Sequence, residues 1–130
     1  MNPQSIQLWQ MQGRFYRLTR PKLEGGGTHD GVHLPDGRVL HITAERGLEV
    51  CGYGDFEQQR EVRIKSMLDP AANDHAWTRV RQLLRENRAY DALTNNCETV
   101  ARKVMGEPNA SPQALVWGLV AVGAVLAAVG

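Results

Sequence analysis

The 130-residue chain has little cysteine, almost no net charge and, before residue 114, no long hydrophobic run. Its formal net charge of +1, with both signs mixed along the chain, predicts no nucleic-acid partner. The two cysteines, Cys51 and Cys97, can form one disulfide at most, and the polar start Met1–Gln12 lacks a signal-peptide pattern. We therefore expect a reducing compartment and one folded domain, because 130 residues bury one modest core.

The C-terminal segment differs from everything before it. Residues 114–130 contain no charged or strongly polar side chain, and as a helix they would reach about 25 Å, slightly less than a bilayer core of roughly 30 Å. We expect a domain over residues 1–110 and a hydrophobic C-terminal helix over 111–130. This helix is interpreted as a single-pass membrane anchor, with Arg102 and Lys103 before it favouring a cytoplasmic domain. A helix that joins copies of the chain in a homo-oligomer is the alternative.

Hydrophobic periodicity predicts strands first and helices afterwards. The expected strands are 14–19, Thr28–Leu34, Arg38–Ala44, Leu48–Tyr53 and Glu61–Met67. One helix is expected from Asn73 or Asp74 to about Arg88, and a second from Asn95 or Asn96 to Gly106. This order predicts an α+β fold, with an antiparallel sheet of four to six strands packed against two helices.

Two histidines lie on the strands of a predicted hairpin. Its turn, Pro35-Asp36-Gly37, is typical of a three-residue loop, which would place His29 and His41 on one face within reach of each other. Gly31, opposite His41, would leave room for the imidazole. The polar face would hold His29, Gly31, His33, His41 and Thr43, and the core face Val32, Leu34, Leu40 and Ile42. His29 and His33 would lie about 13 Å apart, too far to bind one ion, so we expect no metal.

Cys97 is expected at the first turn of a helix. Backbone N–H groups are unsatisfied there, and the helix dipole is positive. We therefore expect a thiol whose pKa is lowered toward neutral, next to donors that could hold an oxyanion. Cys51 lies in a strand-like segment with no histidine pattern nearby, and we interpret it as a packing residue.

The segment from His29 to His41, together with Asn96-Cys97-Glu98, resembles the two sequence boxes of the lecithin:retinol acyltransferase and Hras-like suppressor phospholipase/acyltransferase family. The resemblance implies a permuted papain-like core, similar to cell-wall cysteine peptidases. It also implies that Cys97 is the nucleophile, His29 the general base and His41 the group that orients the base. The chain departs from the family at Asp30, where an aromatic residue is usual, and at Thr99-Val100, where a His-Phe pair is usual.

These residues predict a cysteine acyl hydrolase or acyltransferase that needs no cofactor and forms an acyl-thioester. With a hydrophobic tail at a membrane, a phospholipid ester is the expected acyl donor. A cysteine peptidase or amidase, acting on peptide or cell-wall amides, would need the same centre and stays an alternative. A non-catalytic membrane or assembly module that retains the fold is a third possibility, in which the departures from the family would mark lost activity.

Overall fold

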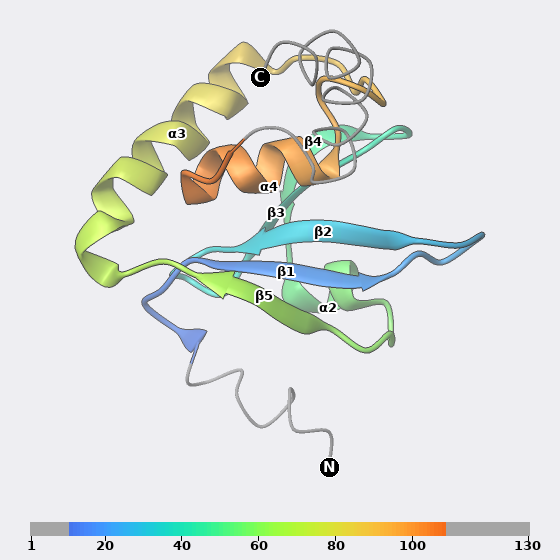
Figure 1. Cartoon of the computed structure of the whole chain (residues 1–130), viewed down its shortest axis with the longest axis horizontal. Helices are drawn as coiled ribbons and strands as arrows, with labels where there is room; N and C mark the ends of the chain where they lie inside the picture. Colours follow the sequence, from blue (N-terminus) through green and yellow to red (C-terminus); the bar gives the residue numbers. More distant parts are fainter. Residues whose placement is uncertain (1–10, 109–130) are drawn as a thin grey trace, which may run out of the picture.

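The computed structural model describes residues 11–108, which form a five-stranded antiparallel sheet with helices on both faces (Figure 1). The strand order is β4-β3-β2-β1-β5. The strands are β1 (Tyr16–Pro21), β2 (Thr28–His33), β3 (Val39–Thr43), β4 (Gly47–Cys51) and β5 (Arg63–Met67). The helices are α2 (Tyr53–Glu57), the 3-10 turn η2 (Pro70–Ala72), α3 (Asn73–Glu86) and α4 (Cys97–Met105).

The predicted α+β class and antiparallel sheet are confirmed. One expected strand is too long, because Leu48–Tyr53 ends at Cys51 and Tyr53 begins the short helix α2. The expected hydrophobic helix at 111–130 lies outside the described residues. Within residues 11–108, no helix combines the length and hydrophobicity needed to span a bilayer.

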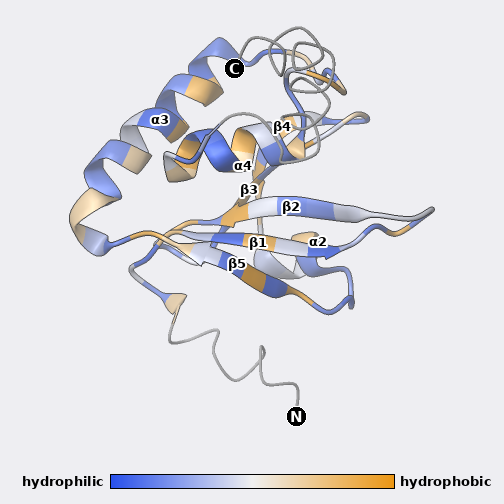
Figure 2. Cartoon of the chain, in the orientation of Figure 1, coloured by the Kyte–Doolittle hydropathy of each residue, from blue (hydrophilic) through white to orange (hydrophobic). Residues whose placement is uncertain are grey.

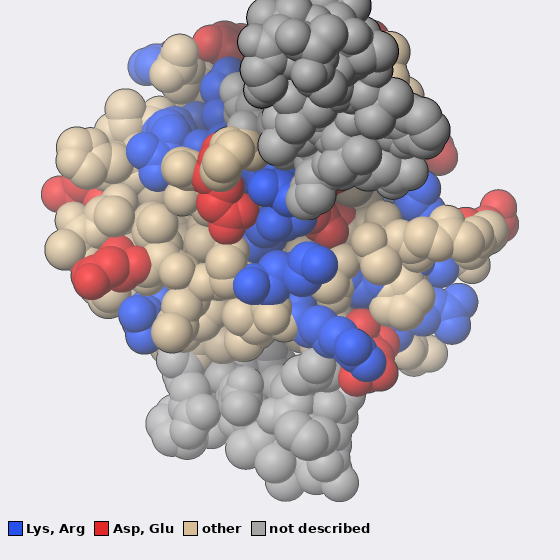
Figure 3. Space-filling model, in the orientation of Figure 1, with Lys and Arg blue, Asp and Glu red and all other residues tan. Residues whose placement is uncertain are grey.

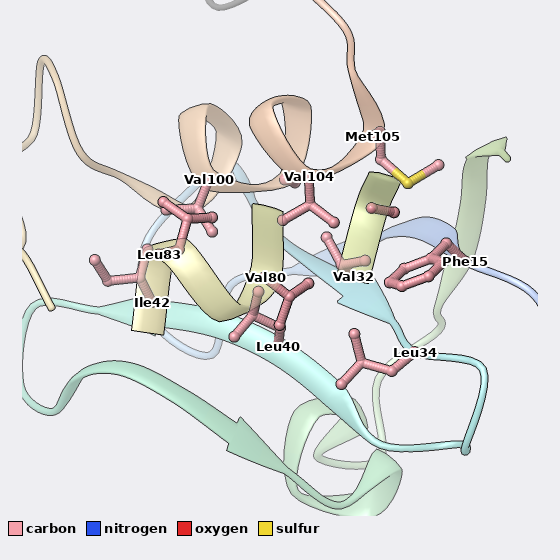
Figure 4. Packing of buried hydrophobic residues seen from close by; sticks show 12 residues of the cluster. Phe15, Val32, Leu34, Leu40, Ile42, Val80, Leu83, Val100, Val104 and Met105 are labelled. Carbon is pink, nitrogen blue, oxygen red and sulfur yellow. The ribbon is translucent and has the colours of Figure 1, made fainter. Parts of the chain in front are cut away.

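The main core lies between one face of the sheet and the helices α3 and α4 (Figure 4). The sheet supplies the four hydrophobic residues predicted for the core side, and all four are almost fully buried: Val32, Leu34, Leu40 and Ile42. Both helices are amphipathic, and each packs its hydrophobic side against these four residues (Figure 2). Each fully buried aliphatic side chain contributes about 1.5–3 kcal/mol, so this layer fixes α4 on β2 and β3.

A second, smaller cluster covers the opposite face of the sheet, beneath α2. Its members are Met11, Tyr16, Leu18, Val39, Phe56 and Val62. Phe56 comes from α2 and is fully buried. This is the face on which the hairpin histidines lie.

The two longer helices begin differently from each other. α4 starts as predicted, because the Asn96 side chain accepts the Thr99 N–H while the Thr99 hydroxyl accepts the Asn96 N–H. Gly106 ends α4 in the left-handed conformation. The predicted cap of α3 at Asn73 or Asp74 is wrong, because Ala72 is the N-cap and both residues lie in the first turn. Asn73 instead donates its amide to the carbonyl of Gly13, and Asp69 accepts an N–H at the preceding 3-10 turn.

Candidate active site

The β2–β3 hairpin brings His29 and His41 into direct contact. Val32 pairs with Leu40 and His33 with Val39, which is the predicted register. His29 Nε2 lies 2.9 Å from His41 Nδ1, and both side chains are buried. The structure therefore joins the two predicted histidines in one hydrogen-bonded pair.

Glu49 extends this pair on the neighbouring strand β4. It lies opposite His41 in the β3–β4 ladder, with its Oε1 2.8 Å from His41 Nε2, and Arg46 holds the same oxygen at 3.0 Å. A carboxylate only accepts hydrogen bonds, so His41 Nε2 carries the proton. In a neutral ring His41 Nδ1 must then accept, so His29 Nε2 donates to it. His29 Nδ1 is consequently left unprotonated and available as a base.

Phe56 packs against both imidazoles. Its ring centroid lies 5.6 Å from that of His29 and 5.9 Å from that of His41. The space opposite His41 at Gly31, expected to admit an imidazole, is instead taken by Phe56 and Val39. A Cβ on Gly31 would lie 2.6 Å from Phe56 Cε1 and 2.9 Å from Val39 Cγ1. Gly31 therefore lets the Phe56 ring reach the histidine pair.

His33 does not join the pair. Its side chain is 1% exposed, its Nδ1 lies 3.2 Å from the carbonyl of Arg14, and its ring meets the edge of Tyr16. It is therefore a satisfied core residue. Among residues 11–108, no group of three or more His, Cys, Asp or Glu side chains is placed to hold a metal ion.

Cys97 is the first residue of α4, is half buried and packs against the main core. It lines one pocket with His29 and His41, but no hydrogen bond joins its sulfur to either imidazole in the described part of the chain. The pocket has a volume of about 1030 Å³. The backbone groups of Asp30 and Glu98 favour the Cys97 thiolate and so act to lower its pKa. Asp30 follows His29 in β2, and α4 packs on this strand.

The prediction that the helix start lowers the pKa of Cys97 toward neutral is wrong for the resting protein. Burial raises the pKa of this thiol and outweighs the backbone donors from Asp30 and Glu98. Burial, followed by the charges of Arg20 and His41, lowers the pKa of His29 to about 4. At neutral pH the site therefore holds a thiol and a neutral imidazole rather than a thiolate–imidazolium pair.

Burial also lowers the pKa of His41, although its hydrogen bond to Glu49 opposes this shift. Both rings of the pair are thus neutral at pH 7, as the proton assignment above requires. The second cysteine, Cys51, packs against the Phe56 cluster, and burial raises the pKa of its thiol to about 11. Cys51 therefore lies where a packing residue was expected.

A buried arginine, Arg17, connects Asp30, which follows His29, with Glu98, which follows Cys97. Arg17 donates to Asp30 at 2.8 Å and to Glu107 at 3.3 Å, and its Nη2 lies 3.9 Å from a Glu98 carboxylate oxygen. Asp30 is 5% exposed, so its charge is compensated inside the protein. This network joins β1, β2 and both ends of α4.

The three residues at which the sequence differs from the family it resembles each have a structural role here. Asp30 is the partner of Arg17, Thr99 closes the capping box of α4, and Val100 is 3% exposed in the main core. Packing and hydrogen bonding thus account for all three residues.

Searches against protein-family models, curated protein sequences and solved structures found no match for this chain.

Proposed function

We propose that this protein is a cysteine acyl hydrolase or acyltransferase that acts on phospholipid esters through an acyl-thioester. The observation that carries the proposal is the hydrogen-bonded series Glu49–His41–His29, whose two histidines line a pocket that also contains Cys97. The series fixes the tautomer of His29, and α4 presents a thiol to the same pocket. Together they supply a base and a nucleophile from elements far apart in the sequence.

In the proposed reaction, Cys97 Sγ attacks the ester carbonyl while His29 Nδ1 accepts the thiol proton. Proton transfer accompanies attack, because both groups are neutral at rest. Backbone N–H groups at the start of α4 stabilise the oxyanion, and the protonated His29 then gives its proton to the departing alcohol. His29 next deprotonates water or an acceptor, which attacks the thioester and releases Cys97. His41 and Glu49 act as positioning residues for the base.

The choice of a lipid donor rests on hydrophobic surface at the pocket and on the sequence. Leu23 and Tyr90 line the pocket and are 47% and 38% exposed, so both offer contact to an acyl chain. The hydrophobic segment 114–130 would hold the domain at a membrane, and the family resemblance implies the permuted papain-like core. We propose a membrane-associated enzyme on these grounds.

Mass spectrometry of the intact protein tests both the chemistry and the substrate. The full chain is incubated separately with short-chain phosphatidylcholine and with a peptide amide carrying an acyl group of the same length. We expect the phospholipid to add one acyl group, located on Cys97 by peptide mapping. An adduct from the amide alone would replace the lipid assignment with the peptidase or amidase alternative. No adduct on Cys97 from either compound would contradict the enzyme assignment.

Replacing Glu49 by glutamine is expected to lower kcat about tenfold while KM changes little. The amide oxygen still accepts from His41 Nε2–H. The negative charge of Glu49, which favours protonation of the hydrogen-bonded pair His41–His29, is gone. The acid limb of the kcat/KM profile, which we expect near the His29 pKa of about 4, should move to lower pH. Glu61→Gln, at an exposed glutamate outside the pocket, is the matched control. An unchanged pH profile in Glu49→Gln would contradict the positioning role.

A further inference from the structure

Arg20 is a buried cation with no carboxylate partner among residues 11–108. Its side chain is 6% exposed, yet no described carboxylate oxygen lies within 4.0 Å of its guanidinium. Two of its nitrogens donate to the backbone carbonyls of Phe56 and Pro21, while Nη2 has no acceptor in the described part of the chain. Arg17 provides the contrast, because it is equally buried and has Asp30 and Glu107 as partners.

The position of Arg20 relates it to the candidate active site. Arg20 lies opposite His29 in the β1–β2 ladder, so the two side chains share a face. Its guanidinium carbon lies 5.2 Å from the centroid of the Phe56 ring, which also contacts both imidazoles. Arg20 lines the pocket that contains Cys97.

Lys22 adds a second cation at the same pocket. It follows β1, is exposed, and forms no ion pair with a described carboxylate. Its charge is one of the causes that lower the pKa of the Cys97 thiol, and both residues line the same pocket. Lys and Arg side chains gather near the middle of the face drawn in Figure 3, mixed with a smaller amount of acidic surface.

A desolvated cation without a counter-charge is costly unless a ligand supplies that charge. We propose that Arg20 and Lys22 form an oxoanion subsite, which binds a phosphate or carboxylate group of the acyl donor beside the carbonyl that Cys97 attacks. Guanidinium nitrogens suit planar, two-point contact with such a group, and the flexible ammonium of Lys22 can close on it from the rim. This inference rests on the proposed function, since it places the anion on the substrate of that reaction.

Binding of an anion would also act on the base. The charge of Arg20 is one of the causes that lower the pKa of His29. An oxoanion on Arg20 offsets that charge, so His29 becomes a stronger base when the donor is bound. The subsite thus couples recognition of an anionic donor to activation of the thiol.

Two alkylating agents that differ only in charge test the subsite. Iodoacetate carries a carboxylate, while iodoacetamide is neutral and nearly the same shape. The ratio of their alkylation rates at Cys97 is measured by peptide mass spectrometry on the full chain and compared with the ratio for free cysteine. We expect the ratio at Cys97 to exceed that of free cysteine about tenfold, because the two cations concentrate the anionic reagent.

Lys22→Gln is expected to lower this ratio about threefold, and Arg20→Gln to lower it further, provided circular dichroism shows a folded chain. Lys103→Gln removes an exposed lysine outside the pocket and should leave the ratio unchanged. A ratio at Cys97 no higher than that of free cysteine would overturn the subsite. An equal fall of this ratio in Lys22→Gln and Lys103→Gln would also overturn the subsite.

Competing anions identify the preferred group. Inorganic phosphate and acetate, added at equal ionic strength, should slow alkylation by iodoacetate, and the stronger competitor indicates whether the donor carries phosphate or carboxylate. Protection by neither anion would overturn the proposal. Failure of the proposed function has a separate signature: Cys97 then forms no acyl adduct, whatever the ratio of the two alkylating agents.

Discussion

Replacing Cys97 by alanine is expected to abolish the acyl adduct and to lower turnover of the phospholipid by at least about a thousandfold. The reason is direct, because the proposed thioester forms on this sulfur, and no other thiol lines the pocket among the described residues. Intact-protein mass spectrometry measures the adduct, and release of the fatty acid measures turnover.

Cys51→Ala is the matched control for the nucleophile. Cys51 is also a half-buried free thiol, but it packs against the Phe56 cluster, and burial raises its pKa to about 11. The control should keep most of the turnover and lose about 1 kcal/mol of stability through its cavity. Equal adduct formation in wild type and Cys97→Ala would contradict the assignment of the nucleophile.

The hairpin could be predicted because the residues that determine it lie close together in the sequence. The alternation of Val32, Leu34, Leu40 and Ile42 sets the core face, and the Pro35-Asp36-Gly37 turn sets the register, so the His29–His41 contact follows from residues close in sequence. The start of α4 is local in the same way, since Asn96 and Thr99 satisfy each other within one turn.

Glu49 was missed although the sequence carries a signal for it. The segments around Thr43 and Gly47 form a second tight hairpin, and its register puts Glu49 opposite His41. Continuing the pairing by one more strand would have found this carboxylate. The resemblance could not indicate this carboxylate, because Glu49 lies on the next strand and belongs to neither of the two sequence boxes.

The remaining features depend on packing between distant elements. Phe56 reaches the histidines from a five-residue helix, which is too short to be predicted from hydrophobic periodicity. The raised pKa of Cys97 reflects burial of α4 against the sheet, which a helix dipole argument alone does not include. The sequence likewise does not show that Arg20 has no carboxylate partner among the described residues, because this depends on which distant residues pack around it.

Gly31→Ala is expected to destabilise the fold by about 1–3 kcal/mol and to reduce turnover at the same time. The added Cβ would lie 2.6 Å from Phe56 Cε1 and 2.9 Å from Val39 Cγ1, so a ring that is fully buried must move. That ring supports both His29 and His41, and its displacement disturbs the relay. Thermal unfolding gives the stability change, which should lower Tm by roughly 4–8 °C for each kcal/mol in a domain of this size.

Gly26→Ala is the control, because a Cβ at Gly26 meets no atom within 4 Å. A second variant isolates the cause. This is the double variant Gly31→Ala/Phe56→Leu, in which the smaller leucine removes the clash. The stability lost by the double variant should therefore be clearly less than the sum of the losses in Gly31→Ala alone and Phe56→Leu alone. Strict additivity of the two losses would show that Gly31 is required for some other reason. An unchanged Tm in Gly31→Ala would show that the Phe56 ring is not held against the histidine pair as described.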